Sequence, residues 1–505
     1  MIEVQHVTST AALLRGAESL LVIAKAATFA DLPAVLPAAV HDAVVDLAKG
    51  VKPGDLGQLE STKVLGAKKN ALRNYHVGVL PDAVSRHNSP AQTEAVRRIA
   101  KRIGDKCAVL VVVDDADHVF GVMTGIARAL PRFERKSEAK AGNAKAPRAE
   151  KAAKSEKATI GIVGRDGKFL KVEPVAERAA HFSREAARLV DIPPSELTPS
   201  AFVREAKAIL KGLAQVTTSE IVGPKLLDKG LGGIHGVGRC ALDAPRLFIA
   251  EYTPKGGAKQ RSAAKGGKHI ALVGKGITYD TGGLNLKIQG SMSGMKGDMG
   301  GAAAMLGAFA TLATTGCKQR MSLLLCLAEN AIGPAAFKPD DILRLHSGKT
   351  VEINNTDAEG RLVLGDGVSY AARVLGATHV LDAATLTGAQ LVATGRLHAG
   401  VVSNDEELEA LIVAAGKASG DLCHALPFAP EFYKKEFSSK VADMLNSVRD
   451  RMNAQSSCAA QFIYNHLEGC DVKWGHVDLA GPAKMDERGT GFGVALITEV
   501  VRRLA

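Results

Sequence analysis

Three glycine-rich segments in the second half of the chain concentrate acidic side chains. The segments are 273–287, 295–302 and 354–362, and their carboxylates are Asp280, Asp298, Asp357 and Glu359. Carboxylates that converge without a counter-charge repel one another and raise one another's pKa. Divalent cations held by hard oxygen ligands remove that conflict. Two such ions roughly 4 Å apart activate a shared water and stabilise negative charge that develops on oxygen. The pattern therefore predicts a two-metal hydrolytic site.

Basic side chains stand among the carboxylates. Two lysines, Lys275 and Lys287, belong to the first segment. A lysine beside divalent cations can lose its proton and bind through its neutral amine. A second lysine that stays charged can polarise a carbonyl oxygen. Arg361 precedes a helix that is predicted to begin near Val363. An arginine beside a helix N-terminus favours an anion there.

The surrounding sequence predicts the elements that position these residues. Apolar runs alternate with helical segments, as in a mostly parallel sheet covered by helices on both faces. The predicted strands are 246–250, 269–273, 322–326 and 379–382, and the predicted helices are 300–314 and 363–374. Ligands of such sheets lie at the carboxyl ends of the strands, where the three segments fall. We expect Asp357 and Glu359 to lie on an extended loop and to project to the same side.

The length of the chain indicates two domains, because 505 residues exceed the size at which one core stops growing. Apolar runs at 108–113 and 158–163 and a helix over 119–129 predict a smaller N-terminal α/β domain at 1–175. Helical periodicity then predicts a connecting helix over 176–190, and the larger catalytic domain would span 191–505. Thr198 and Pro199 predict the N-cap and first residue of a new helix.

The net charge of +11 is concentrated in two stretches, 135–157 and 255–268. Each has a surplus of five positive charges, so the rest of the chain is close to neutral. The first stretch has no aromatic or branched aliphatic residue, which predicts a disordered insertion. Neither stretch interleaves aromatics for stacking on bases, so nucleic-acid binding is disfavoured. Solvated loops are the favoured interpretation, and docking of an acidic partner such as RNA, DNA or a membrane surface stays open as an alternative.

Cysteine spacing and hydropathy favour an intracellular protein. The seven cysteines are widely spaced and form no Cys-x-x-Cys pair, which indicates reduced, buried thiols rather than a disulfide framework. The chain has no run of eighteen apolar residues, so we expect no membrane span. Because the N-terminus lacks the features of a secretory signal, we expect a cytoplasmic location.

The glycine-rich segments resemble the signature blocks of the leucine aminopeptidase family of di-zinc peptidases. Asn355-Thr-Asp-Ala-Glu-Gly-Arg-Leu362 matches the family signature, and 273–283, 296–303 and 382–388 are similar to its other blocks. The resemblance runs from about residue 180 to the end of the chain, and is weaker before that. It implies the two-domain α/β architecture described above and the release of N-terminal leucine and similar residues from peptides.

The resemblance also implies a ligand set for two metal ions. The tighter ion would be bound by Lys275, Asp280, Asp298 and Glu359. The more exchangeable ion would be bound by Asp280, Asp357 and Glu359. The family's metal is Zn²⁺, with Mn²⁺ or a similar ion possible at the exchangeable position.

Two basic residues take catalytic roles by the same resemblance. Lys287 would activate the substrate carbonyl, and Arg361 would hold a bicarbonate ion that acts as general base. The free α-amine of the substrate would bind a metal, so only peptides with a free N-terminus would be cut. A homo-hexamer is also implied. A role in cleaving Cys-Gly or other dipeptides remains an alternative within the same chemistry.

The pocket for the substrate's first side chain is also taken from the resemblance. Small residues and a thioether suit a leucine-like side chain. Ala483 departs from the family, in which we expect a bulkier residue, and a wider pocket would follow. The matching positions are Met295, Thr385, Leu386, Gly388, Ala480 and Ala483.

Overall fold

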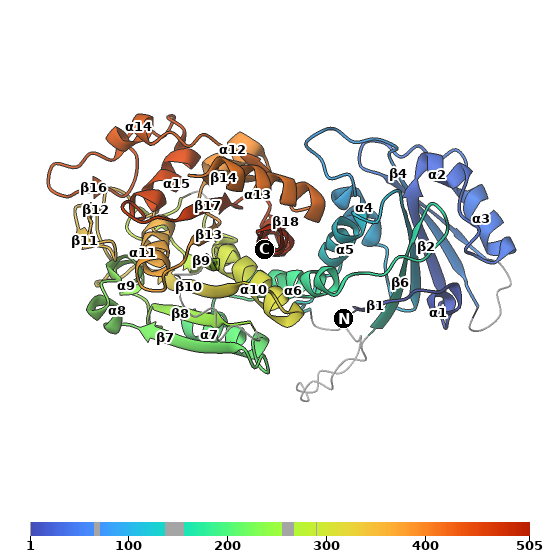
Figure 1. The fold of residues 1–505 in the computed structure, drawn as a ribbon, viewed down its shortest axis with the longest axis horizontal. Coiled ribbons are helices and arrows are strands. Elements are labelled where there is room, and N and C mark those ends of the chain that lie inside the picture. Colours follow the sequence, from blue (N-terminus) through green and yellow to red (C-terminus); the bar gives the residue numbers. More distant parts are fainter. Residues whose placement is uncertain (1, 65–70, 137–155, 255–266, 289, 505) are drawn as a thin grey trace. The chain divides into compact units, whose positions relative to one another are not determined.

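The computed structural model describes residues 2–64, 71–136, 156–254, 267–288 and 290–504 (Figure 1). The chain divides into two compact units, Met1–Ala180 and His181–Ala505. The division falls within helix α6 (Pro174–Asp191), which covers the range predicted as a connecting helix. The domain bounds at 175 and 190 stay predictions. Most of the two basic stretches lies outside the described residues.

The first unit is built on a six-stranded sheet in the order β1-β6-β5-β2-β4-β3. All neighbouring strands are parallel except β3 and β4. The strands are β1 (Ile2–His6), β2 (Ser19–Lys25), β3 (Gln58–Lys63), β4 (Asn74–Leu80), β5 (Cys107–Val113) and β6 (Glu156–Gly164). The strands predicted at 108–113 and 158–163 are thus present. The end of the predicted insertion is wrong by two residues, because the backbone of Glu156 and Lys157 pairs with β1.

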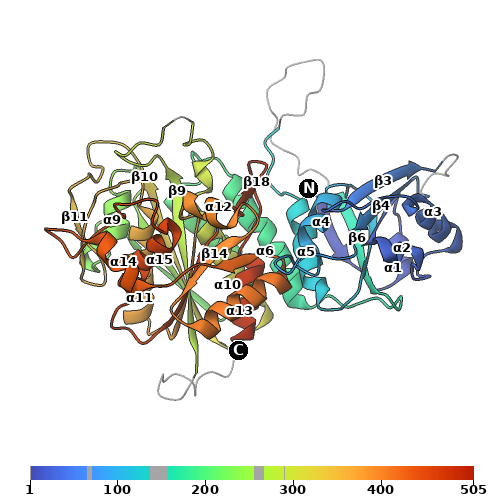
Figure 2. The same cartoon turned by 90° about the horizontal axis from the view of Figure 1, so that it is seen from above.

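Helices cover both faces of this first sheet (Figures 1 and 2). One face carries α1 (Thr10–Leu14), α2 (Ala26–Ala30) and α3 (Ala38–Ala48), and the other carries α4 (Thr93–Ala100) and α5 (His118–Ala129). Alternate residues of a strand point to opposite faces. Leu20 and Val22 of β2 accordingly pack in one cluster with Leu13, Phe29 and Val44 of α1–α3.

The second unit is built on an eight-stranded sheet in the order β15-β14-β17-β13-β9-β10-β8-β7. Its strands are β7 (Val216–Val222), β8 (Arg246–Tyr252), β9 (His269–Asp280), β10 (Arg320–Asn330), β13 (His379–Ala384), β14 (Ala399–Ser403), β15 (Cys423–Ala425) and β17 (Lys473–Asp478). The central strands β10, β9, β13 and β17 are parallel, and so are β14 and β15. The remaining pairs are antiparallel. The predicted mostly parallel sheet is confirmed, although its strands run longer than predicted.

Two sets of helices cover the second sheet (Figure 2). One set is α9 (Gly232–Gly238), α11 (Gly360–Arg373) and α15 (Gln455–Asn465), whose apolar residues share a core with β9 and β10. The other set is α10 (Gly300–Thr315), α13 (Glu406–Ser419) and α16 (Val494–Arg503), of which α16 packs against both α10 and α13. Both sheet faces are therefore buried, which agrees with the uninterrupted apolar runs of the central strands.

Shorter elements complete the second unit. Helix α7 (Pro199–Ile209) begins as predicted, because the Thr198 hydroxyl accepts a hydrogen bond from the backbone N–H of Ala201. The others are α8 (Lys225–Asp228), η3 (Met295–Gly297), β11 (Ile342–Arg344), β12 (Thr350–Glu352), α12 (Gly388–Thr394), α14 (Pro430–Tyr433), η4 (Lys434–Phe437), β16 (Met444–Leu445), β18 (Lys484–Met485) and β19 (Arg488–Gly489).

All seven cysteines carry free thiols. Four of them are buried and three are half-buried, so the predicted reduced state agrees with the structure, whereas full burial does not hold for Cys240, Cys317 and Cys470. No helix among the described residues combines the length and apolar character that crossing a bilayer requires.

Candidate metal centre and substrate cavity

The candidate carboxylates are brought together at the carboxyl end of β9 and at the loops that precede two helices. Asp280 is the last residue of β9, and Asp298 follows η3 just before α10. Asp357 lies in a turn, and Glu359 occupies the residue position just before α11 begins. Oxygen atoms of Asp280, Asp357 and Glu359 all lie within 4.8 Å of one another. This spacing is small enough for one cation to contact all three.

Each of the two lysines bridges a pair of carboxylates. The Nζ of Lys275 lies 2.9 Å from Asp298 Oδ2 and 3.0 Å from Glu359 Oε1, so it links Asp298 to the other acidic residues. The Nζ of Lys287 lies 2.7 Å from Asp280 Oδ2 and 2.5 Å from Asp357 Oδ1. All six residues therefore form one connected charge cluster.

Burial shifts the pKa values of the charged groups in this cluster. Burial, and to a lesser degree Glu359, raises the pKa of Asp280 to about 6. Burial raises the pKa of Asp298 to about 8, with Lys275 opposing the shift and Asp280 adding to it. Burial acts to lower the pKa of Lys275, but the surrounding carboxylates outweigh it and raise that pKa. In this arrangement the ammonium groups supply the counter-charge that the carboxylates need.

The donor set fits a divalent cation. Glu359 Oε2 is buried and has no hydrogen-bond partner among the described residues. An unpaired buried carboxylate oxygen is costly unless a cation or a donor completes it. The remaining ligand atoms are carboxylate oxygens and one amine, and hard divalent ions favour oxygen ligands. The site therefore offers the ligands that a divalent metal would need.

The loop that carries Asp357 and Glu359 differs from the predicted extended loop. Glu359 has helical dihedral angles (φ −73°, ψ −36°), and α11 begins at Gly360 rather than near Val363. The two carboxylates converge because the chain turns into the helix between them. Gly360 is required at this point, since a Cβ there would lie only 2.5 Å from Lys275 Nζ. This correction also places Arg361 in the first turn of α11.

Asparagines that sequence reasoning missed orient the carboxylates. The Asn330 amide donates to Asp280 Oδ1 at 2.9 Å and to the Thr356 backbone oxygen at 3.1 Å. Asn285 and Thr356 exchange hydrogen bonds, each backbone N–H donating to the other's side-chain oxygen at 2.7 Å. The loop after β9 is thereby tied to the loop before α11. Such supporting bonds fix the orientation of ligand side chains.

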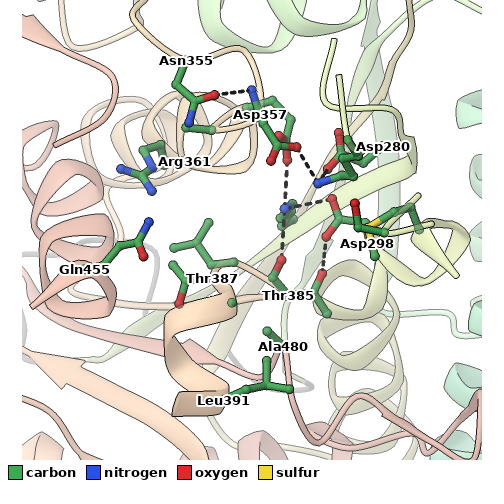
Figure 3. A pocket seen from close by; sticks show the side chains of 18 of the residues that line it. Asp280, Asp298, Asn355, Asp357, Arg361, Thr385, Thr387, Leu391, Gln455 and Ala480 are labelled. Atoms are coloured by element: carbon green, nitrogen blue, oxygen red, sulfur yellow. Dashed lines mark hydrogen bonds and ion pairs between the residues drawn. The ribbon is translucent and has the colours of Figure 1, made fainter. Parts of the chain in front are cut away.

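Arg361 is buried across the cavity from Asp280 and Asp298 (Figure 3). Its Nη1 donates to the Asn446 backbone oxygen at 3.1 Å, while Nε has no hydrogen-bond partner among the described residues. Burial lowers the pKa of Arg361 to about 10, so the guanidinium stays charged at neutral pH. A buried cation with an unsatisfied donor is an environment that favours an anion.

A cavity of about 810 Å³ opens over the charge cluster. Five of the six predicted pocket residues line it, namely Met295, Thr385, Leu386, Gly388 and Ala480. Ala483 is buried and lies beside the lining rather than on it, and the next residue, Lys484, contributes to the lining instead. Further lining residues that the sequence did not single out include Leu391, Arg396, Ser447, Arg451, Gln455 and Lys484.

The segment 385–388 connects this cavity to the charge cluster. The Thr385 backbone oxygen accepts a hydrogen bond from Lys275 Nζ at 3.0 Å, and its hydroxyl donates to Asp298 Oδ1 at 2.8 Å. Asp478, at the end of β17, accepts from the Leu386 backbone N–H at 3.0 Å and from the Thr387 hydroxyl at 2.6 Å. One buried carboxylate thus holds the segment that supports the candidate ligands and lines the cavity.

Comparison with known proteins gives a consistent result. The family model described as the cytosol aminopeptidase family, catalytic domain, matches residues 184–498. The model described as M17 aminopeptidase N-terminal domain 2 matches residues 19–139. The matches divide the chain between a smaller N-terminal part and a larger C-terminal part that contains every candidate site residue.

Relatives and solved structures resemble most of the chain. The probable aminopeptidase NPEPL1 of Mus musculus is 46% identical over 434 residues, which are 85% of this chain and 79% of the relative. Leucine aminopeptidase 1 of Caenorhabditis elegans is 39% identical over 437 residues, 84% of this chain and 83% of the relative. A structure of leucyl aminopeptidase from Trypanosoma brucei with bestatin has a TM-score of 0.85, 36% identity, and coverage of 99% of this chain and 95% of its own. The chain therefore belongs to the M17 cytosol aminopeptidase family and is a hydrolase.

Proposed function

We propose that the chain is a metal-dependent aminopeptidase that removes N-terminal leucine and other hydrophobic residues from peptides with a free N-terminus. The observation that carries this proposal is the convergence of Asp280, Asp357 and Glu359, joined to Asp298 through Lys275, beneath a cavity of about 810 Å³. Family membership supports the same reaction. The relatives named leucine or leucyl aminopeptidase support the preference for leucine.

Two divalent ions are proposed for this site, with Zn²⁺ at one position and Zn²⁺ or Mn²⁺ at the exchangeable position. Bound divalent ions supply Lewis acidity to a peptide carbonyl and lower the pKa of a water. Lys275, Asp280, Asp298 and Glu359 would hold one ion, and Asp280 and Glu359 would share the second with Asp357. Lys275 must give up its Nζ proton to serve as a ligand, so metal binding is coupled to proton release.

The remaining polar groups would act directly on the substrate. The Lys287 ammonium, already placed between Asp280 and Asp357, would donate to the oxygen of the scissile carbonyl and stabilise charge that develops there. The Arg361 guanidinium would hold a bicarbonate ion through its unsatisfied donor, and a bicarbonate bound there would supply a general base. The lining around Thr385, Leu386 and Ala480 would take the first side chain of the substrate.

Hydrolysis of leucyl amide by the full chain, with Mn²⁺ or Zn²⁺ supplied and with both removed by a chelator, tests the proposal. We expect release of leucine with metal, none with chelator, and none from N-acetyl-leucyl amide. The T. brucei relative was solved with bestatin, so inhibition by bestatin is also expected. Absence of leucine release with either metal present would refute the proposal.

A dipeptidase role is the alternative within this chemistry. Turnover of Cys-Gly beside leucyl amide separates the two, and a higher kcat/KM for Cys-Gly would favour the dipeptidase.

The family resemblance also motivates the proposals of a homo-hexamer and a cytoplasmic location, which sedimentation and fractionation would test. Docking of an acidic partner on the two basic stretches is a separate possibility, and such binding should weaken steeply with salt.

A further inference from the structure

One wall of the substrate cavity carries a lysine whose charge the proposed reaction does not use. Lys484 begins β18 and is half-buried on the lining, in the place where the resemblance led us to expect Ala483. Met295 and Thr385 line the same cavity. The first side chain of a substrate in this pocket would therefore meet an ammonium group as well as apolar and hydroxyl groups.

The outer part of the Lys484 side chain contacts the turn formed by residues 294–297. Its Nζ donates to the Gly294 backbone oxygen at 2.8 Å. Its stem lies across η3, because a Cβ on Gly297 would be only 2.9 Å from the Lys484 Cδ atom. Glycine at 297 is thus what allows the lysine to lie on the turn that carries Met295. These contacts define the position of the ammonium in the cavity wall.

Asp191 fixes both parts of this wall from behind. Its side chain accepts hydrogen bonds from Arg488 Nε and from the Gly489 backbone N–H, both at 2.8 Å, which anchors the β18–β19 hairpin. Its backbone oxygen accepts from Lys296 Nζ at 2.5 Å, which anchors η3. Polar groups held by a second layer of contacts are positioned before the ligand arrives, and this lowers the cost of binding.

The groups that surround the Lys484 ammonium differ from those around the other lysines of the cavity. Lys275 and Lys287 each lie within ion-pair distance of two carboxylates. Lys484 donates to a neutral carbonyl, and no carboxylate of the described chain lies within ion-pair distance of its Nζ. An ammonium has three donors, so two remain for a ligand. The wall therefore offers positive charge and hydrogen-bond donors to whatever side chain fills the pocket.

We propose that Lys484 determines how the enzyme discriminates the charge of the substrate's first side chain. Side chains that end in a carboxylate or amide oxygen gain from its donors. Side chains that end in an ammonium or guanidinium are rejected, because like charges in a partly desolvated pocket repel strongly. This inference rests on the proposed function, and on the resemblance that places the first side chain against Met295 and Ala480.

Two pairs of aminoacyl amides isolate the charge of the first side chain. Norleucine has the side chain of lysine without its ammonium, and glutamine has the shape of glutamate without its charge. The experiment measures kcat/KM for all four amides with the metal-loaded enzyme and its variants. In Lys484→Met we expect the lysine-to-norleucine ratio to rise and the glutamate-to-glutamine ratio to fall, each by at least about tenfold. Lys484→Glu should move both ratios further in the same directions.

Matched variants separate charge from packing. Lys484→Arg keeps the charge and should keep both ratios near the wild-type values. Lys211→Met removes a positive charge from an exposed side chain that is not part of the lining, so both ratios should stay unchanged. Melting temperatures and metal contents show whether each variant is folded and loaded.

Specific outcomes overturn the inference. The inference would be contradicted if both ratios stayed within about twofold of wild type in Lys484→Met and Lys484→Glu while leucyl amide was still hydrolysed. It would also be contradicted if the two ratios moved in the same direction, because this would indicate altered packing of the pocket rather than a change of charge. If the wild-type enzyme released no leucine at all, the proposed function would have failed instead, so the two failures are distinguishable.

Discussion

At the scale of single residues, the site pairs each lysine with two carboxylates, and this pairing explains how four acidic groups share one pocket. Lys275 joins Asp298 to Glu359, and Lys287 joins Asp280 to Asp357. The two lysines differ in surroundings. Lys275 is fully buried and also donates to the Thr385 backbone oxygen, whereas Lys287 is half-buried at the cavity, where it can reach a substrate. Their different proposed roles follow from this difference.

Replacement of Lys287 by methionine tests its proposed role. Because the ammonium would stabilise charge on the carbonyl oxygen only as the reaction proceeds, kcat for leucyl amide should fall by about 100-fold or more, with a smaller change in KM. Metal content, measured by mass spectrometry of the purified protein, should stay at the wild-type value because Lys287 is not a proposed ligand.

Lys287→Arg is the control for charge, and it should recover part of the lost kcat. The proposed role would be wrong if Lys287→Met lowered the metal content and left the activity per bound metal unchanged. In that case the lysine would act only as a partner of Asp280 and Asp357.

Residues within the glycine-rich segments could be predicted from the sequence, whereas the residues that orient them could not. Asp357, Glu359 and Arg361 stand together in one signature. Asn330 follows Glu329 at the end of a mostly apolar strand, and Asn446 follows a two-residue strand that no periodicity marks. Both make their contacts with residues far away in the chain, so no local pattern indicates them.

At the scale of elements, the segment 385–388 depends on the strand beside β13. Asp478 of β17 accepts hydrogen bonds from Leu386 and Thr387, and Thr385 in turn contacts Lys275 and Asp298. The carboxyl ends of neighbouring parallel strands meet at one edge of the sheet, which is what allows a residue of β17 to support a loop that follows β13.

Asp478→Asn should loosen this segment without a change of side-chain size. The amide replaces the oxygen that accepts from the Thr387 hydroxyl with a donor, and a lost buried hydrogen bond of this kind costs roughly 1–3 kcal/mol. Because the segment lines the cavity, KM for leucyl amide should rise about tenfold. Steady-state kinetics check this. A lower melting temperature with an unchanged KM would show that Asp478 only stabilises the fold.

The buried carboxylate of Asp366 in α11 predicts how the stability of the fold changes with pH. Its carboxylate accepts from the backbone N–H of Ile234 at 2.9 Å and of His346 at 2.8 Å, and burial raises its pKa to about 7 from an ordinary value of 3.8. A folded-state pKa above the unfolded value gives stabilisation that is complete below the unfolded pKa and is lost as the pH rises through the folded pKa. The contribution of Asp366 should therefore decline between about pH 4 and pH 7.

Melting temperatures of wild type and Asp366→Asn across this pH range test the assignment. The amide cannot ionise, so the melting temperature of the variant relative to wild type should increase as the pH rises. Parallel curves for the two proteins would show that Asp366 does not titrate in this range.

The bounds of helices and strands could be predicted where one local sequence signal determines them. They were predicted less well where a tertiary contact opposes the local signal. The continuous apolar run of β5 and the Thr198-Pro199 start of α7 each follow from a single local signal. The start of α11 was placed too late because Gly360 disfavours helix interiors. Here the close approach of Lys275 requires glycine in the first turn, so a tertiary contact outweighs local propensity.

At the scale of the whole molecule, the chemistry belongs to one unit. Every candidate ligand, catalytic residue and cavity residue lies within His181–Ala505, and none of the described residues of the first unit is among them. The net charge of +11 gives no information about the site, because ten of these charges belong to residues 135–157 and 255–268. The net charge by itself favours an acidic binding partner. The positions of the charged residues show that most of the net charge belongs to two stretches that contain no candidate site residue.

Replacing residues 137–155 with a short Gly-Ser linker should therefore leave hydrolysis of leucyl amide within about twofold of wild type, since no candidate ligand, catalytic or cavity residue belongs to this range. Activity of the purified variant, compared with wild type at equal metal content, checks this expectation. Loss of activity in a folded variant would show that the segment takes part in the reaction.

The central claim is that these carboxylates hold two catalytic metal ions, and metal analysis of wild type against Asp357→Ala tests it most directly. Asp357 is exposed at the edge of the cluster and is a proposed ligand of the exchangeable ion alone. Wild type should contain two ions per chain, and the variant should contain one and lose at least about 100-fold in kcat for leucyl amide. Wild-type activity without bound metal, or an Asp357→Ala variant that cleaves leucyl amide at the wild-type rate, would contradict the account.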